Sequence, residues 1–356
     1  MSKKQRVFKL GSKKISNWGE PYVIAEIGVN HEGSLSLAKE LIYQAKEGGA
    51  DAAKFQSYKA SKIASKNAMS YWDTSLERTK NQYELFKKYD KFNPSDYEKL
   101  KEYSDELKID FLSTPFDHEA VNFLDELVPF FKVASADITN IPMLELIAKK
   151  KKPIILSTGA SDIKEINLAI DTLKQSECEE IVLLHCILNY PTENHNANLK
   201  MIKHLSDMYK EFFIGYSDHT LPDKHMNTLV YAYLLGAIVI EKHFTNDKTK
   251  QGNDHYHAMD KYDLKNFINR ISEIKELIGE SITKEPIEGE EISRKNARRS
   301  LVLSHSLKKN HLLIEEDILC KRPGTGISPI NIKDVIGKKL TRNLEEDHIL
   351  EWNDIN

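Results

Sequence analysis

Several features are scarce or absent in this sequence of 356 residues. It has only three cysteines, widely spaced and without a CxxC pair, so we expect reduced thiols and a cytoplasmic location. No apolar run approaches the roughly 20 residues of a membrane span, and the opening MSKKQRVFKL lacks the apolar core of a signal peptide. The formal charge of −3 gives no electrostatic reason to expect a nucleic acid or a membrane surface as a partner. These observations favour a soluble globular protein.

Short apolar, β-branched runs recur along the chain, and helical patterns lie between them. We count eight such runs, at residues 22–30, 51–58, 110–116, 130–137, 153–160, 180–190, 212–220 and 237–244. Eight β/α units in roughly 260 residues match the size of a (β/α)8 barrel. An open doubly wound sheet is the alternative, but the first strand–helix turn, GVNHEGS, has no GxGxxG fingerprint. The predicted fold is therefore α/β, a TIM barrel.

The helical patterns and the loops between them outline the domains. Ser34 is placed to cap a first helix that Gly48 ends, and Pro222 is placed to open a later one. The gap at 59–109 is long, so we expect an inserted segment at the catalytic end of the barrel, where it would serve as a lid. We predict a barrel domain with a short N-terminal extension over residues 1–280, a polar linker at 281–296 and a small domain at 297–356.

Polar side chains collect where the predicted strands end, which in a barrel is the catalytic end. The predicted strand over 237–244 ends in Glu241, Lys242 and His243, an unusual finish for a strand packed in a core. Cations and hydroxyl or backbone donors of the kind that bind phosphate and carboxylate follow other strands, namely Lys54, Lys132, Ser135, Ser157, Thr158 and Gly159. Each has a structural explanation, as an ion pair or a helix cap. Together they indicate an anion-binding site, because an unpaired buried charge is costly.

His219 and His243 end neighbouring predicted strands at comparable depth. Two imidazoles and a carboxylate, either Asp137 or Glu26, would hold a divalent metal with coordination positions left open. The alternative is that each histidine is a hydrogen-bonded structural residue. We favour the metal.

At these residues the chain resembles the N-acetylneuraminate (sialic acid) synthase family, over nearly its whole length from Tyr22. The motifs that carry the resemblance are AEIGVNHEGS, AAKFQS, STPFD, FKVASADITN, ILSTGAS, GYSDHT, EKHFT, GNDH, RRSLV and KRPGTG. The resemblance implies a barrel followed by a small β-rich SAF domain, similar to type III antifreeze protein. It also implies a transferase of carbohydrate biosynthesis that condenses phosphoenolpyruvate with an N-acetylated hexosamine to a nine-carbon 2-keto-3-deoxy sugar acid and phosphate.

The resemblance implies a role for each matching residue. The residues that match phosphoenolpyruvate-binding positions or fall beside them are Lys54, Gln56, Lys132, Ser135, Ser157, Thr158 and Ser217. His219 and His243 match ligands of a divalent metal, Mn²⁺ in family members, with Mg²⁺ and Co²⁺ as alternatives. Glu26 matches a carboxylate near the metal, and Asp137 stands where some members have Glu; either is the candidate for proton transfer, beside the catalytic Lys54 and Lys132.

The acceptor end of the match involves Tyr190, Asp254 and Arg322. Arg322 matches an arginine that reaches from the SAF domain into the partner's barrel, which implies a domain-swapped homodimer. Ile187, Leu188 and Asn253 depart from the family pattern near this end, so the sequence does not choose the hexosamine. We take N-acetylmannosamine as the default; the 2,4-diacetamido-trideoxyhexoses that lead to legionaminic or pseudaminic acid are the alternatives. A Schiff-base aldolase using Lys132 or Lys54, a 3-deoxy sugar acid phosphate synthase and a non-catalytic sugar-binding barrel are the competing functions.

Overall fold

The computed structural model describes residues 6–72, 74–75, 77–178, 180–252, 254–281 and 283–356. The chain divides into two compact units, Met1–Ile278 and Gly279–Asn356, each with its own hydrophobic core. No helix in the described part of the chain is long and apolar enough to cross a membrane.

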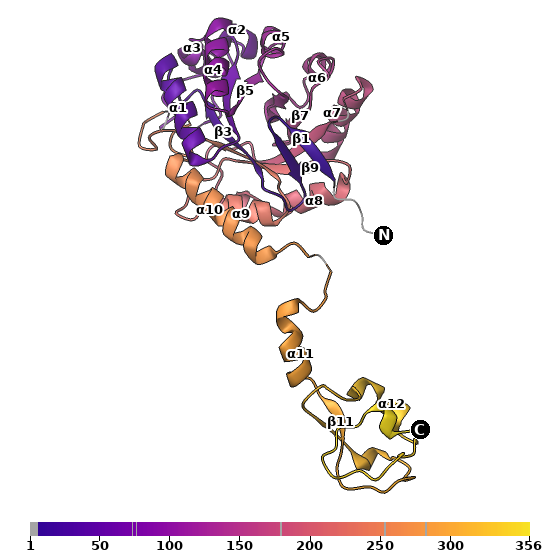
Figure 1. Cartoon of the computed structure of the whole chain (residues 1–356). Helices are drawn as coiled ribbons and strands as arrows, with labels where there is room; N and C mark the ends of the chain where they lie inside the picture. Colours follow the sequence, from indigo (N-terminus) through magenta and orange to yellow (C-terminus); the bar gives the residue numbers. More distant parts are fainter. Residues whose placement is uncertain (1–5, 73, 76, 179, 253, 282) are drawn as a thin grey trace. The chain divides into compact units, whose positions relative to one another are not determined.

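The first unit is a barrel of parallel strands surrounded by helices (Figure 1). Its eight strands are β3 (Tyr22–Gly28), β4 (Ala52–Ser57), β5 (Asp110–Pro115), β6 (Phe131–Val133), β7 (Ile154–Ser157), β8 (Ile181–Cys186), β9 (Phe213–Asp218) and β10 (Val239–His243). The first of them, β3, pairs in parallel with both β4 and the last strand, β10. The ends of the hydrogen-bonded order, β5 and β6, also contact each other. The predicted TIM barrel is therefore confirmed.

The helices that follow the strands are α1 (Leu35–Gly48), α4 (Pro94–Glu106), α5 (His118–Leu124), α6 (Ile141–Ala148), α7 (Ile163–Gln175), α8 (Lys200–Met208), α9 (Asn227–Leu234) and α10 (Lys261–Ile278). Ser34 caps α1 as predicted, because its side chain accepts a hydrogen bond from the amide of Leu37. The predicted start of α9 at Pro222 is wrong. Met226 has a left-handed φ of 49°, so the regular helix begins only at Asn227.

An N-terminal hairpin, β1 (Val7–Leu10) and β2 (Lys13–Ser16), packs Leu10 and Ile15 into the barrel core. The amide of Ser12 donates to Asp110, the first residue of β5, at 2.8 Å. The hairpin therefore lies at the amino ends of the strands. This leaves the carboxyl ends, the catalytic end of the fold, to the strand–helix loops.

The long segment between β4 and β5 forms two helices before α4, namely α2 (Ala60–Ile63) and α3 (Gln82–Tyr89). Asn81 caps α3 by accepting from the amide of Glu84, and Asn93 caps α4 with Pro94 in its first turn. α2 and α3 contact each other. They follow the carboxyl end of β4 and so belong to the catalytic end of the barrel.

The second unit contains α11 (Glu291–Ala297), the antiparallel pair β11 (Ser300–Leu303) and β12 (Ile318–Lys321), and α12 (Ile332–Val335). Part of the predicted linker is thus helical. Two similar stretches, 300–319 and 337–356, form matching turns: His311 Nε2 lies 2.8 Å from Asp317 Oδ2, and His348 Nε2 lies 2.8 Å from Asp354 Oδ2. The amides of Leu307 and Leu344 each donate to the other's carbonyl, which joins the two stretches.

Candidate active site

A cavity of about 460 Å³ lies at the carboxyl ends of the barrel strands. Most of the residues that the sequence singled out line it together: Glu26, Lys54, Gln56, Lys132, Ser135, Asp137, Ser157, Tyr190, Ser217, His219, His243 and Asp254. They come from six strands, the loops after these strands and, for Tyr190, the loop after β8, although they are spread over more than half the chain. The strand ends therefore converge on one pocket.

Within the described part of the barrel, one predicted site residue, Thr158, does not line this cavity. Thr158 follows Ser157, which faces the cavity, so its side chain points the other way, and its hydroxyl donates to the carbonyl of Leu184 at 2.9 Å. Arg322 is an exposed residue of the second unit. Lys242 also turns outward, between the cavity-lining Glu241 and His243, and its ammonium lies 2.6 Å from Asp218 Oδ2.

Lys54 lies at the centre of a buried charge cluster. Its ammonium pairs with Glu26, lies 3.6 Å from Glu241 Oε2 and donates to Thr114 at 3.1 Å. Burial alone would lower the pKa of Lys54, but the two carboxylates raise it, so it remains a fixed cation. Burial raises the pKa of Glu26 despite the opposing effect of Lys54, which makes this carboxyl a stronger base than an exposed one.

Glu241 is a site residue that the sequence-based site prediction omitted. Its Oε1 lies 3.6 Å from Lys132 Nζ and accepts from Ser217 at 2.9 Å, while its Oε2 faces Lys54. Burial would raise the pKa of Glu241, but Lys132 and Lys54 outweigh it and lower the pKa. The signal was present in the sequence, because Glu241 is in phase with His243 on the same strand.

The charge of Lys132 is less well balanced by nearby carboxylates than that of Lys54. Burial, aided by the nearby Lys54, lowers its pKa despite the attraction of Glu241. Its ammonium also donates to the carbonyl of Val133 at 3.1 Å. An incoming anion would therefore restore charge balance at Lys132.

Neutral donors surround the two lysines. The hydroxyl oxygen of Ser135 accepts from the amide of Gly159 at 2.9 Å, and a Cβ at Gly159 would approach that oxygen to 2.8 Å. Glycine at position 159 is thus needed for this close approach. The buried hydroxyl of Ser157 has no partner among the described residues, so it is free to bind a ligand.

The position of Glu26 depends on an irregularity in β3. The register between β3 and β4 shifts between Glu26 and Gly28, and Gly28 has a left-handed φ of 56°. A Cβ at Gly28 would lie 3.2 Å from Gln56 Nε2, the atom that donates to Glu26 Oε1 at 3.0 Å. The bulge and its glycine therefore hold Glu26 and Gln56 in contact.

The two predicted metal ligands lie on one side of the cavity. The ring centres of His219 and His243 are 5.4 Å apart. His219 Nδ1 lies 2.9 Å from the carbonyl of Ile187, which fixes this nitrogen as the donor and leaves Nε2 as a lone-pair ligand. Burial lowers the pKa of His219 to about 4, so its ring is neutral, as metal binding requires.

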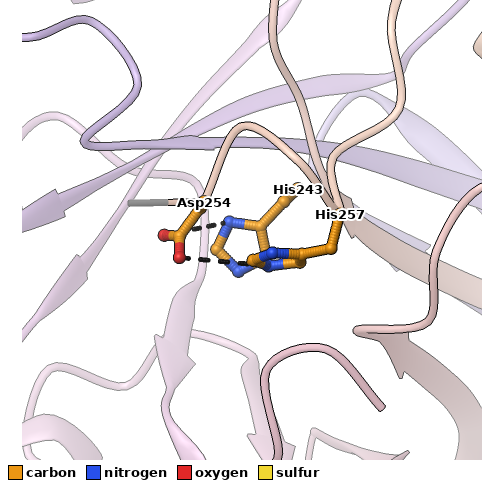
Figure 2. Close-up of side chains that lie close together, drawn as sticks. All are labelled: His243, Asp254 and His257. Atoms are coloured by element: carbon orange, nitrogen blue, oxygen red, sulfur yellow. Dashed lines mark ion pairs between the residues drawn. The ribbon is translucent and has the colours of Figure 1, made fainter. Parts of the chain in front are cut away.

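Asp254 and His257 join His243 in a cluster whose ligand atoms all lie within 4.8 Å of one another (Figure 2). Asp254 points its carboxylate at both rings, with Oδ2 3.4 Å from His243 Nδ1 and Oδ1 3.9 Å from His257 Nε2. Burial and the neighbouring Glu26 raise the pKa of Asp254 to about 7. The role predicted for Asp254 was contact with the acceptor, and His257 was not among the predicted site residues.

These residues fit a divalent metal. Nδ1 of His243 and both ring nitrogens of His257 are buried without a hydrogen-bond partner among the described residues, and a carboxylate stands beside them. Neutral imidazoles and a carboxylate are donors that first-row divalent ions accept. The cluster is therefore a possible metal-binding site.

Apolar and aromatic side chains line the remaining part of the cavity. Those from the inserted segment and the adjacent loops are Tyr58, Ile63, Tyr71, Trp72, Leu85, Phe86, Tyr89 and Phe116. The ring centre of Tyr58 lies 5.3 Å from that of Phe86 and 6.2 Å from that of Phe116, and both contacts are edge-to-face. We call this set the apolar wall. The inserted segment also contributes Glu77 and Gln82 to the lining, so the cavity combines buried charges with a largely aromatic surface.

The barrel, with lysines and a histidine cluster in its mouth, defines an enzyme that acts on an anionic substrate. The chain belongs to the NeuB family, which matches residues 41–283, and residues 298–356 match the SAF domain.

Relatives of known name support this assignment. The chain is 41% identical over 341 residues to the N,N'-diacetyllegionaminic acid synthase of Legionella pneumophila, covering 94% of each protein. It is 33% identical to the human N-acetylneuraminate-9-phosphate synthase, covering 92% of this chain and 90% of the relative. The crystal structure of N-acetylneuraminic acid synthetase from Leptospira borgpetersenii, in complex with citrate, matches with a TM-score of 0.72 and 34% identity, over 81% of this chain and 95% of that one. The chain is accordingly an enzyme of the sugar-acid synthase class.

Proposed function

We propose that this enzyme condenses phosphoenolpyruvate with a 2,4-diacetamido-trideoxyhexose to a nine-carbon 2-keto-3-deoxy sugar acid, with release of phosphate. The observation that carries the proposal is the lining of the cavity, which combines buried lysines with the apolar wall. A deoxy sugar with two acetyl groups presents methyl groups to such a wall. N-acetylmannosamine, the default from sequence, has hydroxyl groups at the corresponding carbons, so it is the second candidate.

The relatives support this choice of acceptor. N,N'-diacetyllegionaminic acid synthases of Legionella pneumophila and Campylobacter jejuni are 41% and 38% identical to the chain. The human N-acetylneuraminate-9-phosphate synthase and the Helicobacter pylori pseudaminic acid synthase are 33% and 32% identical. The higher identity goes with the two legionaminic acid synthases, whose acceptor is one of the diacetamido-trideoxy sugars.

In the proposed reaction, Lys54 and Lys132 bind the phosphate and carboxylate of phosphoenolpyruvate, because they are buried cations facing one cavity. Ser135, Ser157 and Ser217 supply hydroxyl groups around the same anion. Carbon 3 of phosphoenolpyruvate attacks the open-chain aldehyde of the sugar, water adds to carbon 2, and phosphate leaves by cleavage of its bond to that carbon. Removal of one fixed cation from such an anionic transition state raises its free energy by about 3 kcal/mol.

Glu26 is our candidate for accepting the proton of the attacking water. Burial raises the pKa of Glu26, and Gln56 and Lys54 orient its two oxygens. Asp137 is the alternative, because it also lines the cavity and burial raises its pKa. Glu26→Gln and Asp137→Asn separate the two, since only the true base should lower kcat at least 100-fold when replaced.

His219 and His243 would hold a divalent metal, Mn²⁺ or alternatively Mg²⁺ or Co²⁺. The bound ion would supply Lewis-acid polarisation of the acceptor aldehyde. Tyr190 packs on His219 with ring centres 4.1 Å apart and so positions that imidazole. Asp254 would bind hydroxyl groups of the acceptor.

Arg322 of the SAF domain would reach the acceptor in the barrel of a second subunit, which makes the working enzyme a domain-swapped homodimer. All three cysteines are free, which agrees with the cytoplasmic location that the sequence predicts.

The decisive test is phosphate release from phosphoenolpyruvate with Mn²⁺ and each candidate sugar. We expect the highest kcat/KM with the 2,4-diacetamido-trideoxymannose acceptor. Equal or greater turnover of N-acetylmannosamine would instead identify that sugar as the acceptor. Borohydride treatment in the presence of pyruvate should leave Lys54 and Lys132 unmodified; a covalent adduct would instead indicate a Schiff-base aldolase.

A further inference from the structure

His257 differs from the other buried histidines of the barrel. It is fully buried, yet neither of its ring nitrogens has a hydrogen-bond partner among the described residues. In contrast, His185 Nε2 lies 2.8 Å from the carbonyl of Ala197, and His255 Nδ1 lies 2.8 Å from Thr245 Oγ1. A buried polar group without a partner costs free energy, so an orphaned imidazole calls for a ligand.

The surroundings of His257 indicate which ligand. Its ring centre is 4.8 Å from that of His243 and 6.2 Å from that of His219. Three imidazoles that share one ion at a metal–nitrogen distance of about 2.1 Å have ring centres roughly 4.5 to 5.5 Å apart. The separations of His243 from His257 and from His219, 4.8 Å and 5.4 Å, fall within this range. The 6.2 Å between His219 and His257 exceeds it, so binding of one ion by all three would bring these two rings closer together. Asp254 lies at the same position, with Oδ1 3.9 Å from His257 Nε2.

We propose that His257 is a third imidazole ligand of the divalent ion that His219 and His243 would hold. This inference rests on the metal role given above and is independent of the choice of acceptor sugar. Figure 2 shows the ring of His257 beside that of His243, with the carboxylate of Asp254 directed at both. Three imidazoles favour Co²⁺ and Zn²⁺ over Mg²⁺, because nitrogen donors suit the later transition metals.

The first test counts the imidazole ligands directly in the wild-type enzyme. Each histidine bound to Co²⁺ through one nitrogen carries a proton on the other, and this proton gives a strongly shifted NMR signal that exchanges with water. We expect three such signals in the Co²⁺-loaded full-length protein. Two signals would overturn the proposal, and this result requires no substitution that endangers folding.

The second test compares two neighbouring substitutions. His257→Gln should remove one shifted signal and weaken Co²⁺ and Mn²⁺ binding at least 10-fold, measured by competition with a chelating dye. His255→Gln is the matched control, because His255 lies in the same loop but bonds to Thr245; it should keep three signals and wild-type affinity. Unchanged affinity in His257→Gln would contradict a ligand role.

The two proposals fail in different ways. Metal-dependent phosphate release by an enzyme with two shifted signals would keep the proposed function and remove His257 from the metal site. A wild-type enzyme that binds neither Co²⁺ nor Mn²⁺ would overturn the metal role and His257 together. A wild-type enzyme that shows three shifted signals but releases no phosphate from the proposed substrates would instead contradict the choice of substrates.

Discussion

Lys132 and Glu241 form an ion pair, with 3.6 Å between Nζ and Oε1, in a part of the cavity where both side chains are almost fully buried. The second carboxylate oxygen of Glu241 lies 3.6 Å from Lys54. Lys54 also pairs with Glu26, whereas Lys132 has only the shared carboxylate of Glu241, so Lys132 is the cation with attraction for a further anion. This arrangement suits the binding of phosphoenolpyruvate and leads to the first prediction.

Lys132→Met should lower kcat/KM for phosphoenolpyruvate at least 100-fold, because a fixed cation is worth about 3 kcal/mol to an anionic transition state. Lys132→Arg should keep part of the activity, since it preserves the charge but not the geometry. Lys149→Met, which removes an exposed lysine, should have no effect. Steady-state kinetics at saturating acceptor measures all three, and a KM change without loss of kcat/KM would contradict the role.

Removal of the metal should abolish turnover. Enzyme treated with a chelator and then freed of it should release no phosphate until Mn²⁺ or Co²⁺ is added, because the aldehyde would no longer be polarised. His219→Ala and His243→Ala should stay inactive at any metal concentration while retaining the wild-type circular dichroism spectrum. Full activity in stripped wild-type enzyme would rule out the metal role.

Arg322→Ala should weaken acceptor binding and leave the KM for phosphoenolpyruvate near normal. The physical reason is that the guanidinium would contact only the acceptor's acetamido group. Lys321→Ala is the control, because Lys321 is an exposed neighbour paired with Asp347. A parallel rise in both KM values would show that Arg322 acts on folding or assembly instead.

The apolar wall should determine the choice of acceptor. Phe86→Ala removes a side chain that packs against Tyr58, so kcat/KM for the diacetamido-trideoxy sugar should fall about 10-fold, with a smaller change for N-acetylmannosamine. Glu84→Ala, on the exposed side of α3, should leave the ratio of the two kcat/KM values unchanged. An equal fall in kcat/KM for both sugars would show that the apolar wall does not determine specificity.

Asp354 should stabilise the second unit in a pH-dependent manner. Burial opposes ionisation, but hydrogen bonds from His348, the amide of Glu351 and Arg342 lower the pKa of Asp354. A carboxyl whose folded pKa is depressed contributes stability above its unfolded pKa of about 3.9 and loses it as pH falls through the folded value. Asp354→Asn should therefore lower the free energy of unfolding by about 2 kcal/mol at pH 7 and have little effect in strong acid.

Trp352, two residues from Asp354, reports unfolding of this unit when Trp18→Phe and Trp72→Phe remove the barrel signals. Urea titrations at pH 7 and in strong acid measure the difference. Asp347→Asn, at an exposed ion pair with Lys321, should change stability by less than about 0.5 kcal/mol. Equal effects of the two substitutions would contradict the role of the buried carboxylate.

The sequence was sufficient to predict the barrel, because eight β-branched runs separated by helical patterns leave few alternatives. Strand alternation places Lys54 and Gln56, or Ser217 and His219, on the same face, so most strand-end residues could be chosen in advance. Thr158 shows that not every polar residue at a strand end faces the cavity. It follows Ser157 directly, and adjacent residues of a strand face opposite sides.

Glu241 and His257 were left out of the predicted site for different reasons. Strand alternation places Glu241 on the same face as His243, but a carboxylate among lysines is equally consistent with a structural ion pair. The distances to Lys54 and Lys132 then place Glu241 in the cavity. His257 lies in a loop, where no periodicity predicts the direction of a side chain. The apolar wall was also unpredictable, because most of its aromatic residues come from an insertion with irregular spacing.

The connection between β4 and β5 has a practical consequence for engineering. It supplies much of the apolar wall, including Phe86, yet it enters and leaves the barrel at fixed points. Exchanging this segment between homologous synthases would therefore replace most of the apolar wall without altering the pairing of any barrel strand. A single scaffold would then yield a panel of catalysts for unnatural nine-carbon acids.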